Sequence, residues 1–181
     1  NNKELTAEVN GVAFFKGDKM LGFLTPDETK YLLFTINKVY GGLLTVSSQN
    51  GEMEDTALEI STNTTKRSYS YQGGNLKVII QIKAEVYLGE IQRKADMLNE
   101  QEILKLESAA ENKIEQEITA LVRKMQSEYG LDIFGFGGMI YEKEPELWQS
   151  IKPGWDELFK TIDIQIQCDV KLSNTAIIMR N

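Results

Sequence analysis

A single cysteine is the one side chain of this 181-residue sequence that resembles a nucleophile. Cys168 has no histidine to activate it, because the chain contains none, and a reactive thiol needs a neighbouring base. The residue also lies on the apolar side of an alternating segment at 162–172. The pattern predicts a buried structural cysteine. The missing histidine also excludes Ser-His-Asp, Cys-His and histidine-based metal sites, and one cysteine forms no intramolecular disulfide.

Clustered glycines at Gly135, Gly137 and Gly138 invite comparison with a phosphate-binding loop. A dinucleotide-binding loop needs a third glycine after two residues, where this chain has Ile140. The segment also lacks a preceding strand and the Lys-Ser/Thr pair of a triphosphate site. Glycine next to aromatic residues predicts backbone packed closely against rings, and we expect no cofactor here.

Acidic and aromatic residues gather further along the chain, where Glu142, Glu144 and Glu146 precede Trp148. Carboxylates beside an aromatic ring are typical of carbohydrate sites, but negative charge is also favoured at a solvated helix start. Trp148 and Trp155 either form an exposed recognition patch or hold short helices against a long one. Both interpretations stay open, so a small-molecule or carbohydrate-binding domain that uses these two tryptophans is the alternative function.

Composition closes several other classes of function. The chain has 27 acidic and 20 basic residues and no run of Lys or Arg, which argues against nucleic acid and against a polybasic grip on lipid. No apolar run reaches the roughly 18 residues that span a bilayer. The sequence opens with Asn1-Asn2-Lys3, so we expect a processed or trimmed piece of a longer protein. Residues 1–181 show no linker and predict one compact domain.

The elements that must position these residues begin with a hairpin, 57–71 and 75–88 around Gly73-Gly74. Its second arm alternates between an apolar and a largely polar face, which is typical of an antiparallel sheet covered on one side. A long helix is expected from Asn99 to about Tyr129, beginning with a capping box between Asn99 and Glu102. Its apolar stripe favours packing on the sheet over a coiled coil.

The remaining elements are shorter. Thr25-Pro26-Asp27-Glu28 predicts a helix start, and Gly41-Gly42 its end. The other expected elements are strands at 6–16, 20–24, 43–46, 161–172 and about 175–179, and short helices near 145–151 and 154–159. The sequence therefore predicts an α+β fold, with a largely antiparallel β-sheet packed against one long amphipathic helix plus short helices.

Two blocks of this sequence resemble the C-terminal domain of the spore germinant receptor C subunits, the Ger(x)C or GerAC lipoproteins. The first block is Val12-Ala-Phe-Phe-Lys16 to Leu24, with Asp27-Glu-Thr29 behind it. The second comprises Asp132-Ile-Phe-Gly-Phe-Gly137, Pro145-Glu-Leu-Trp148, Trp155-Asp-Glu-Leu-Phe159 and the strand 162–172. One departure is the turn Ser173-Asn174-Thr175-Ala176, where the family has a glycine and asparagine takes its place.

The resemblance implies a non-enzymatic interaction or scaffold subunit of a nutrient germinant receptor, with no cofactor, metal or catalytic residue. Its implied partners are the membrane-embedded A-type and B-type receptor subunits, in relatives of Bacillus and Clostridium. The implied location is the outer face of the spore inner membrane, reached through a lipid anchor on an N-terminal region outside these residues, which are themselves expected to be soluble. Partner contact is expected near 132–155, at Asp132, Phe134, Phe136, Trp148 and Trp155.

Overall fold

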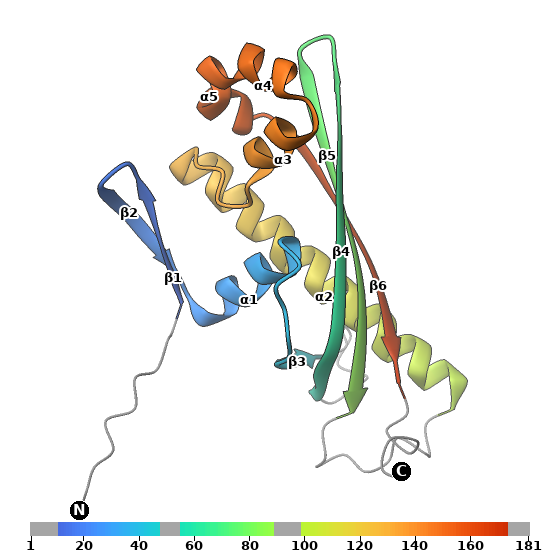
Figure 1. Ribbon diagram of the computed structural model, residues 1–181. Coiled ribbons are helices and arrows are strands. Elements are labelled where there is room, and N and C mark those ends of the chain that lie inside the picture. The colour runs from blue at the N-terminus through green and yellow to red at the C-terminus, as the bar shows by residue number, and fades with distance from the viewer. Residues whose placement is uncertain (1–10, 48–54, 89–98, 174–181) are drawn as a thin grey trace, which may run out of the picture.

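The protein is represented by a computed structural model that describes residues 11–47, 55–88 and 99–173 (Figure 1). Its elements are β1 (Val12–Lys16), β2 (Lys19–Leu24), α1 (Pro26–Thr35), β3 (Leu43–Val46), β4 (Thr56–Gln72), β5 (Asn75–Leu88), α2 (Glu100–Lys124), the π-helical turn η3 (Met125–Tyr129), α3 (Phe136–Lys143), α4 (Pro145–Ile151), the 3-10 turn η4 (Lys152–Gly154), α5 (Trp155–Phe159) and β6 (Asp163–Leu172). The expected strand at 175–179 and the start of the one at 6–16 lie outside the described residues.

The strands form a four-stranded sheet in the order β3-β4-β5-β6 and a separate two-stranded sheet of β1 and β2. Three of the four pairings are antiparallel, and β5 pairs with β6 in parallel. The parallel pairing arises because the chain returns through α2 and the short helices and enters β6 at the end of the sheet where β5 begins. The predicted α+β fold with a largely antiparallel sheet is confirmed.

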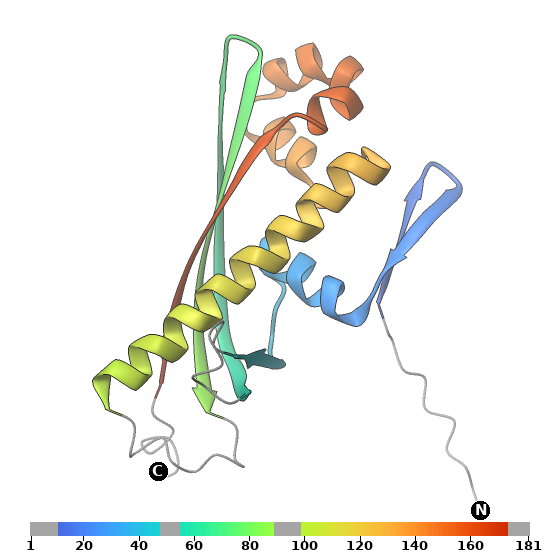
Figure 2. The same cartoon turned by 180° about the vertical axis from the view of Figure 1, so that it is seen from behind.

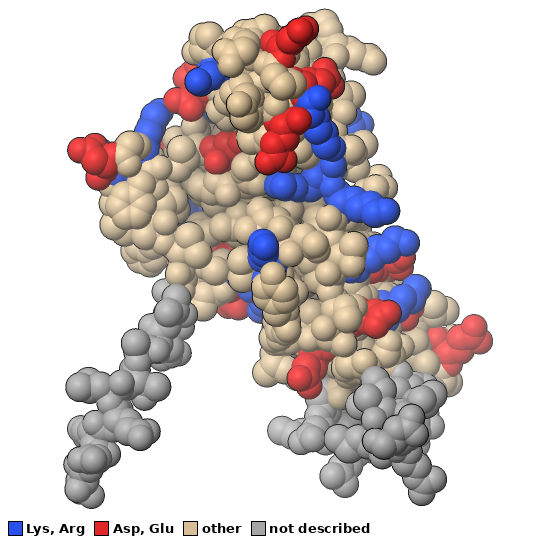
Figure 3. Space-filling model, in the orientation of Figure 1, with Lys and Arg blue, Asp and Glu red and all other residues tan. Residues whose placement is uncertain are grey.

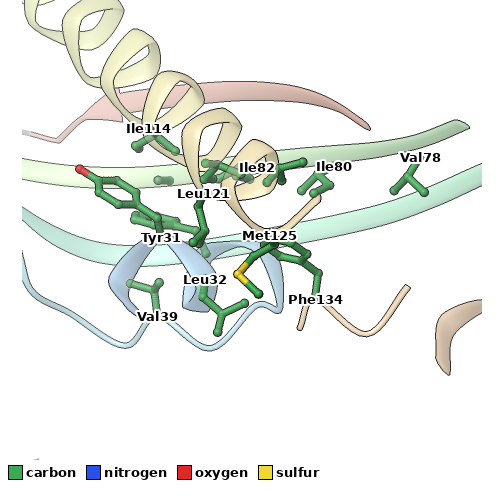
Figure 4. Packing of buried hydrophobic residues seen from close by; sticks show 14 of the residues in the cluster. Tyr31, Leu32, Val39, Val78, Ile80, Ile82, Ile114, Leu121, Met125 and Phe134 are labelled. Atoms are coloured by element: carbon green, nitrogen blue, oxygen red, sulfur yellow. The ribbon is translucent and has the colours of Figure 1, made fainter. Parts of the chain in front are cut away.

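The hydrophobic core lies between the long helix and one face of the four-stranded sheet (Figure 2). Alternate residues of β5 point into it and are buried, namely Leu76, Val78, Ile80, Ile82, Ala84 and Val86. Ile114, Leu121 and Met125 approach them from the helix, and Tyr31 and Leu32 of α1 close the core from the side (Figure 4). This packing confirms that the apolar stripe of the helix faces the sheet.

Three glutamates spaced one helical turn apart on α2 bind the outer edge of β6, and we call them the carboxylate ladder. Glu107, Glu111 and Glu115 accept hydrogen bonds from the backbone N–H groups of Leu172, Val170 and Cys168, at 3.0, 3.0 and 2.8 Å. Four helical residues rise by about 6 Å and two strand residues by about 6.6 Å, so the two repeats stay in step. Because β6 is the edge strand within the described residues, the ladder supplies acceptors that no further strand of that part of the chain provides.

Both predicted capping boxes are present. The Thr25 side chain caps α1 and the Asn99 side chain caps α2, each with the expected glutamate bonding back. The predicted end of α1 at Gly41-Gly42 was wrong, because the helix stops at Thr35 and Asn37 adopts the left-handed conformation, with φ 58°. Asparagine tolerates that conformation, so it ends the helix before the glycines are reached.

We expect Glu111→Ala to lower the free energy of unfolding by about 1–3 kcal/mol, because it leaves the N–H of buried Val170 without its acceptor. Urea unfolding followed by circular dichroism measures the change. Glu117→Ala is the matched control on the same helix. Glu117 pairs with Lys113 at the surface, and its loss should cost about 0.5 kcal/mol or less. Equal losses in the two variants would show that the ladder contributes nothing specific.

A pH-dependent contribution is expected from Glu28, whose carboxylate lies 2.6 Å from Lys124 Nζ and joins α1 to α2. Burial by itself raises the pKa of Glu28, but hydrogen bonds from Lys124 and Thr25 outweigh it and hold the pKa below its ordinary value of 4.5. A lowered pKa means stabilisation that is complete above the unfolded value and lost as the pH falls through the folded one.

The melting temperature of Glu28→Gln should therefore fall furthest below that of the wild type at neutral pH. The gap should shrink as the pH drops below the ordinary carboxyl range, when both proteins carry a neutral side chain. Thermal melts over a pH series measure the gap, with the exposed Glu142→Gln as control. A gap that stays constant down to acidic pH would contradict the assignment.

Candidate functional site

The segment that joins η3 to α3 is shaped by one part-buried carboxylate. Gly130 ends η3 in the left-handed conformation, with φ 56°, as expected for a C-terminal glycine. Asp132 then accepts hydrogen bonds from the N–H groups of Phe134 and Gly137, at 3.1 and 2.8 Å. Burial raises the pKa of Asp132, although the surrounding backbone N–H groups oppose that rise. The carboxylate therefore positions the start of α3.

Phe134 and Phe136 belong to the core. Their rings stack with centroids 5.3 Å apart, Phe134 also approaches Phe159 at 6.5 Å, and the two are only 1% and 0% exposed. We expected both as part of a partner-contact surface, and their burial corrects that expectation. They stabilise the helical segment from inside, so a contact surface in this region must be built from other side chains.

Trp148 and Trp155 lie against each other and against α3. Their rings meet edge to face, with centroids 5.2 Å apart, and both side chains are half-buried. A Cβ added at Gly137 would lie 2.7 Å from Cη2 of Trp148 and 3.2 Å from Cε2 of Trp155. This contact confirms that a glycine of the segment packs directly against aromatic rings. The half-buried tryptophans hold α3, α4 and α5 together while each keeps part of its ring at the surface.

The helical segment α3–α5 docks on the far end of the β4–β5 hairpin. Arg67 donates to the carbonyl of Phe134 at 2.7 Å, and Tyr69 donates to the Glu144 carboxylate at 3.0 Å. Lys143 donates to the carbonyl of Arg67 at 3.3 Å and lies over the Tyr69 ring. The helix α3 was missed by sequence reasoning, because its Phe-Gly-Gly start has low helix propensity and is positioned by these tertiary contacts.

Two observations on the described residues bear on metal binding and on the reactivity of the thiol. They contain no group of three or more His, Cys, Asp or Glu side chains able to hold a metal ion. Burial, with Glu115 and Glu111 nearby, raises the pKa of the Cys168 thiol to about 12, so the thiol stays protonated and unreactive at neutral pH. A shallow trough lies on the open sheet face, lined by residues such as Thr64, Lys83 and Asp169, and neither tryptophan lines it.

The exposed part of this region is polar with an aromatic component. Figure 3 shows acidic and basic side chains mixed over the short helices. Lys143 and Glu144 of this region form hydrogen bonds to the hairpin. Tyr141, in α3 and close in sequence to Lys143 and Glu144, is 54% exposed. Of the five residues expected at a contact surface, the tryptophans alone remain partly accessible without an internal polar role. No described helix is both long enough and apolar enough to cross a membrane.

Comparison with known proteins gives one consistent result. The family model described as "Spore germination B3/ GerAC like, C-terminal" matches residues 10–176. Spore germination protein B3 of Bacillus subtilis (strain 168) is 26% identical over 176 residues, which cover 96% of this chain and 46% of that protein. Spore germination protein YndF of the same organism is 27% identical over 169 residues, which cover 93% of this chain and 40% of that protein.

A solved structure agrees with these relatives. The crystal structure of the GerBC protein superposes with a TM-score of 0.82 at 26% identity, covering 93% of this chain and 53% of that one. The chain thus spans less than half the length of the two curated relatives and about half of the solved one. The fold is shared over nearly the whole of this chain.

The contact between Gly137 and the tryptophans gives a sharp test of the packing. We expect Gly137→Ala to lower the free energy of unfolding by about 1–3 kcal/mol, because the new methyl group overlaps the Trp148 ring. Chemical unfolding followed by tryptophan fluorescence measures the loss. The neighbouring Gly138→Ala is the control, since a Cβ there meets nothing within 4 Å and alanine favours the helix. A Gly137 variant as stable as the Gly138 variant would contradict this packing.

Proposed function

This chain belongs to the family described as Spore germination B3/GerAC like, C-terminal, and we propose that it acts as a non-enzymatic interaction subunit of a nutrient germinant receptor. Its homologues are spore germination proteins, which supports a role in germination. The match over residues 10–176 is the observation that carries the proposal. A family match assigns no role to single residues, so the finer argument depends on what their side chains do.

Three polar groups near the short helices and β6 are engaged in the fold. The Cys168 thiol is protonated beside the carboxylate ladder. Asp132 accepts a hydrogen bond from the N–H of Gly137 in α3, and Glu144 accepts one from the Tyr69 hydroxyl. These contacts commit Cys168, Asp132 and Glu144 to the fold, which supports the interaction role over a catalytic one.

The partners and the location follow from the same proposal. We assign the domain to a complex with the membrane-embedded A-type and B-type subunits, on the outer face of the spore inner membrane. Residues 1–181 form one domain of a longer lipoprotein in this proposal, and the lipid anchor belongs to the N-terminal region of that protein. The relatives support it by their length, since this chain covers 46% and 40% of two of them.

We place partner contact on the outer surface of α3–α5, where Trp148, Trp155 and Tyr141 expose aromatic area. Aromatic residues that are partly buried in their own domain are well suited to contacts, because little side-chain entropy remains to be lost. The alternative, a small-molecule or carbohydrate site at the tryptophans, has less support. Their rings pack on each other and on Gly137, and neither lines the trough on the sheet.

The first test is recovery of the complex. The full-length protein carries an affinity tag in its sporulating host, is extracted from spore membranes, and its co-purifying proteins are identified. We expect the two membrane-embedded receptor subunits. A Tyr141→Glu, Lys152→Glu double variant should reduce their recovery about tenfold or more while the protein stays folded, since both residues are exposed at the proposed surface.

Lys66→Glu is the matched charge reversal on the outer face of the sheet, away from the short helices, and should leave recovery unchanged. Loss of recovery in this control alone would move the contact to the sheet. Absence of both receptor subunits from the wild-type preparation would overturn the proposed function.

A further inference from the structure

The β1–β2 hairpin is fixed to the body of the protein by one of its two faces. Phe14 and Leu24 are buried on that face, and the Phe14 ring meets Tyr129 edge to face at 4.8 Å. Lys16, at the turn, forms an ion pair with Asp156 of α5 at 2.7 Å. These contacts join the hairpin to the end of the long helix and to the short helices, so its orientation is defined (Figure 1).

The opposite face of the hairpin is apolar and largely exposed within the described residues. The pairs Ala13–Phe23 and Phe15–Met20 lie across from each other in the strand register and form what we call the outer face. Phe15, Met20 and Phe23 are 51%, 50% and 66% exposed. A surface strand normally alternates between an apolar inner face and a polar outer one, and this outer face has no polar side chain. Such a patch marks a contact surface.

The hairpin is also incomplete as a sheet. It has two strands, and within the described residues neither pairs with a further strand. An isolated two-stranded sheet is marginally stable in water and gains stability when its faces or edges are covered. The inner face of the hairpin is covered by the body of the protein. The outer face and the free edges therefore call for a second apolar element.

The position of the hairpin in the chain points to the element that covers it. β1 begins at Val12, beside the first residue of the family match at 10–176, and the family is described as the C-terminal part of its proteins. The relatives have more than half of their length outside the matched region. We propose that the outer face of β1–β2 is the docking surface for an apolar element of the polypeptide that precedes residue 1 in the full-length protein. This inference rests on the proposal that the chain is one domain of a longer protein.

Two other occupants fit an apolar face, a second copy of the chain and a lipid surface. The net charge of −7 opposes binding to anionic lipid, and the Lys16 charge is already paired with Asp156. A covalently linked domain is present at a high effective concentration, so it covers the face before a free partner does. The preceding polypeptide is therefore the occupant that these observations favour.

The test uses the purified full-length protein and compares wild type with a Phe15→Ser, Phe23→Ser double variant. Hydrogen–deuterium exchange reports protection of the β1–β2 amides, and the β4–β5 amides report that the domain is folded. We expect the double variant to exchange about tenfold or more faster in β1–β2, because two aromatic contacts with the preceding domain are lost. Tyr40→Ser removes an aromatic residue that is 83% exposed in a loop and should leave the hairpin unchanged.

Equal exchange in wild type and double variant would overturn the proposal by showing that nothing covers the face. Protection that rises with protein concentration, together with a dimer in sedimentation velocity, would assign the face to a second copy. Protection that appears only with phosphatidylglycerol vesicles would assign it to lipid. All measurements are made without receptor subunits, so their outcome is independent of whether the full-length protein recovers those subunits from spores.

Discussion

The match in repeat between α2 and β6 is the constraint on which the rest of the structure depends. Three carboxylates, each one helical turn from the next, meet three alternate N–H groups of an edge strand, with the helix and the strand running in opposite directions. Because alternate strand residues share an orientation, a slip of β6 by one residue would withdraw all three donors and turn Val170 away from the core. The ladder and the hydrophobic alternation therefore select the same register.

Once α2 is held against the sheet, its last turns place the other helices. Lys124 reaches Glu28 at the start of α1, and Gln126 of η3 donates to the carbonyls of Phe159 and Ile162, at 2.9 and 3.0 Å. The contact between Lys124 and Glu28 positions α1 at the side of the core. The contacts of Gln126 position the segment that leads from α5 into β6. The short helices are then held between the end of α2 and the tip of the β4–β5 hairpin. Each half-buried tryptophan completes a structure whose position is already set by polar contacts.

Apart from the end of α1, local signals in the sequence predicted the local structure, and the other errors occur where distant parts of the chain decide. The capping boxes at Thr25 and Asn99 and the turn at Gly73-Gly74 depend on residues within a few positions of each other, and all three were predicted correctly. The parallel pairing of β6 depends on the path of the chain through α2. The burial of Phe134 and Phe136 depends on a hairpin tip some 65 residues earlier, where Arg67 binds the carbonyl of Phe134. No short-range pattern contains that information.

The two sheets treat their exposed backbone differently, and the difference bears on function. On the large sheet, the ladder covers β6, and Asn37 and Lys143 bind backbone groups of β4 at Thr65 and Arg67. Such guarding prevents unwanted strand pairing. The small sheet has no such guards in the described residues, and its outer face is apolar. The two sheets of the described residues thus differ in how far their surfaces are protected from association. The exposed apolar face of the hairpin therefore fits the docking surface proposed above for the β1–β2 sheet.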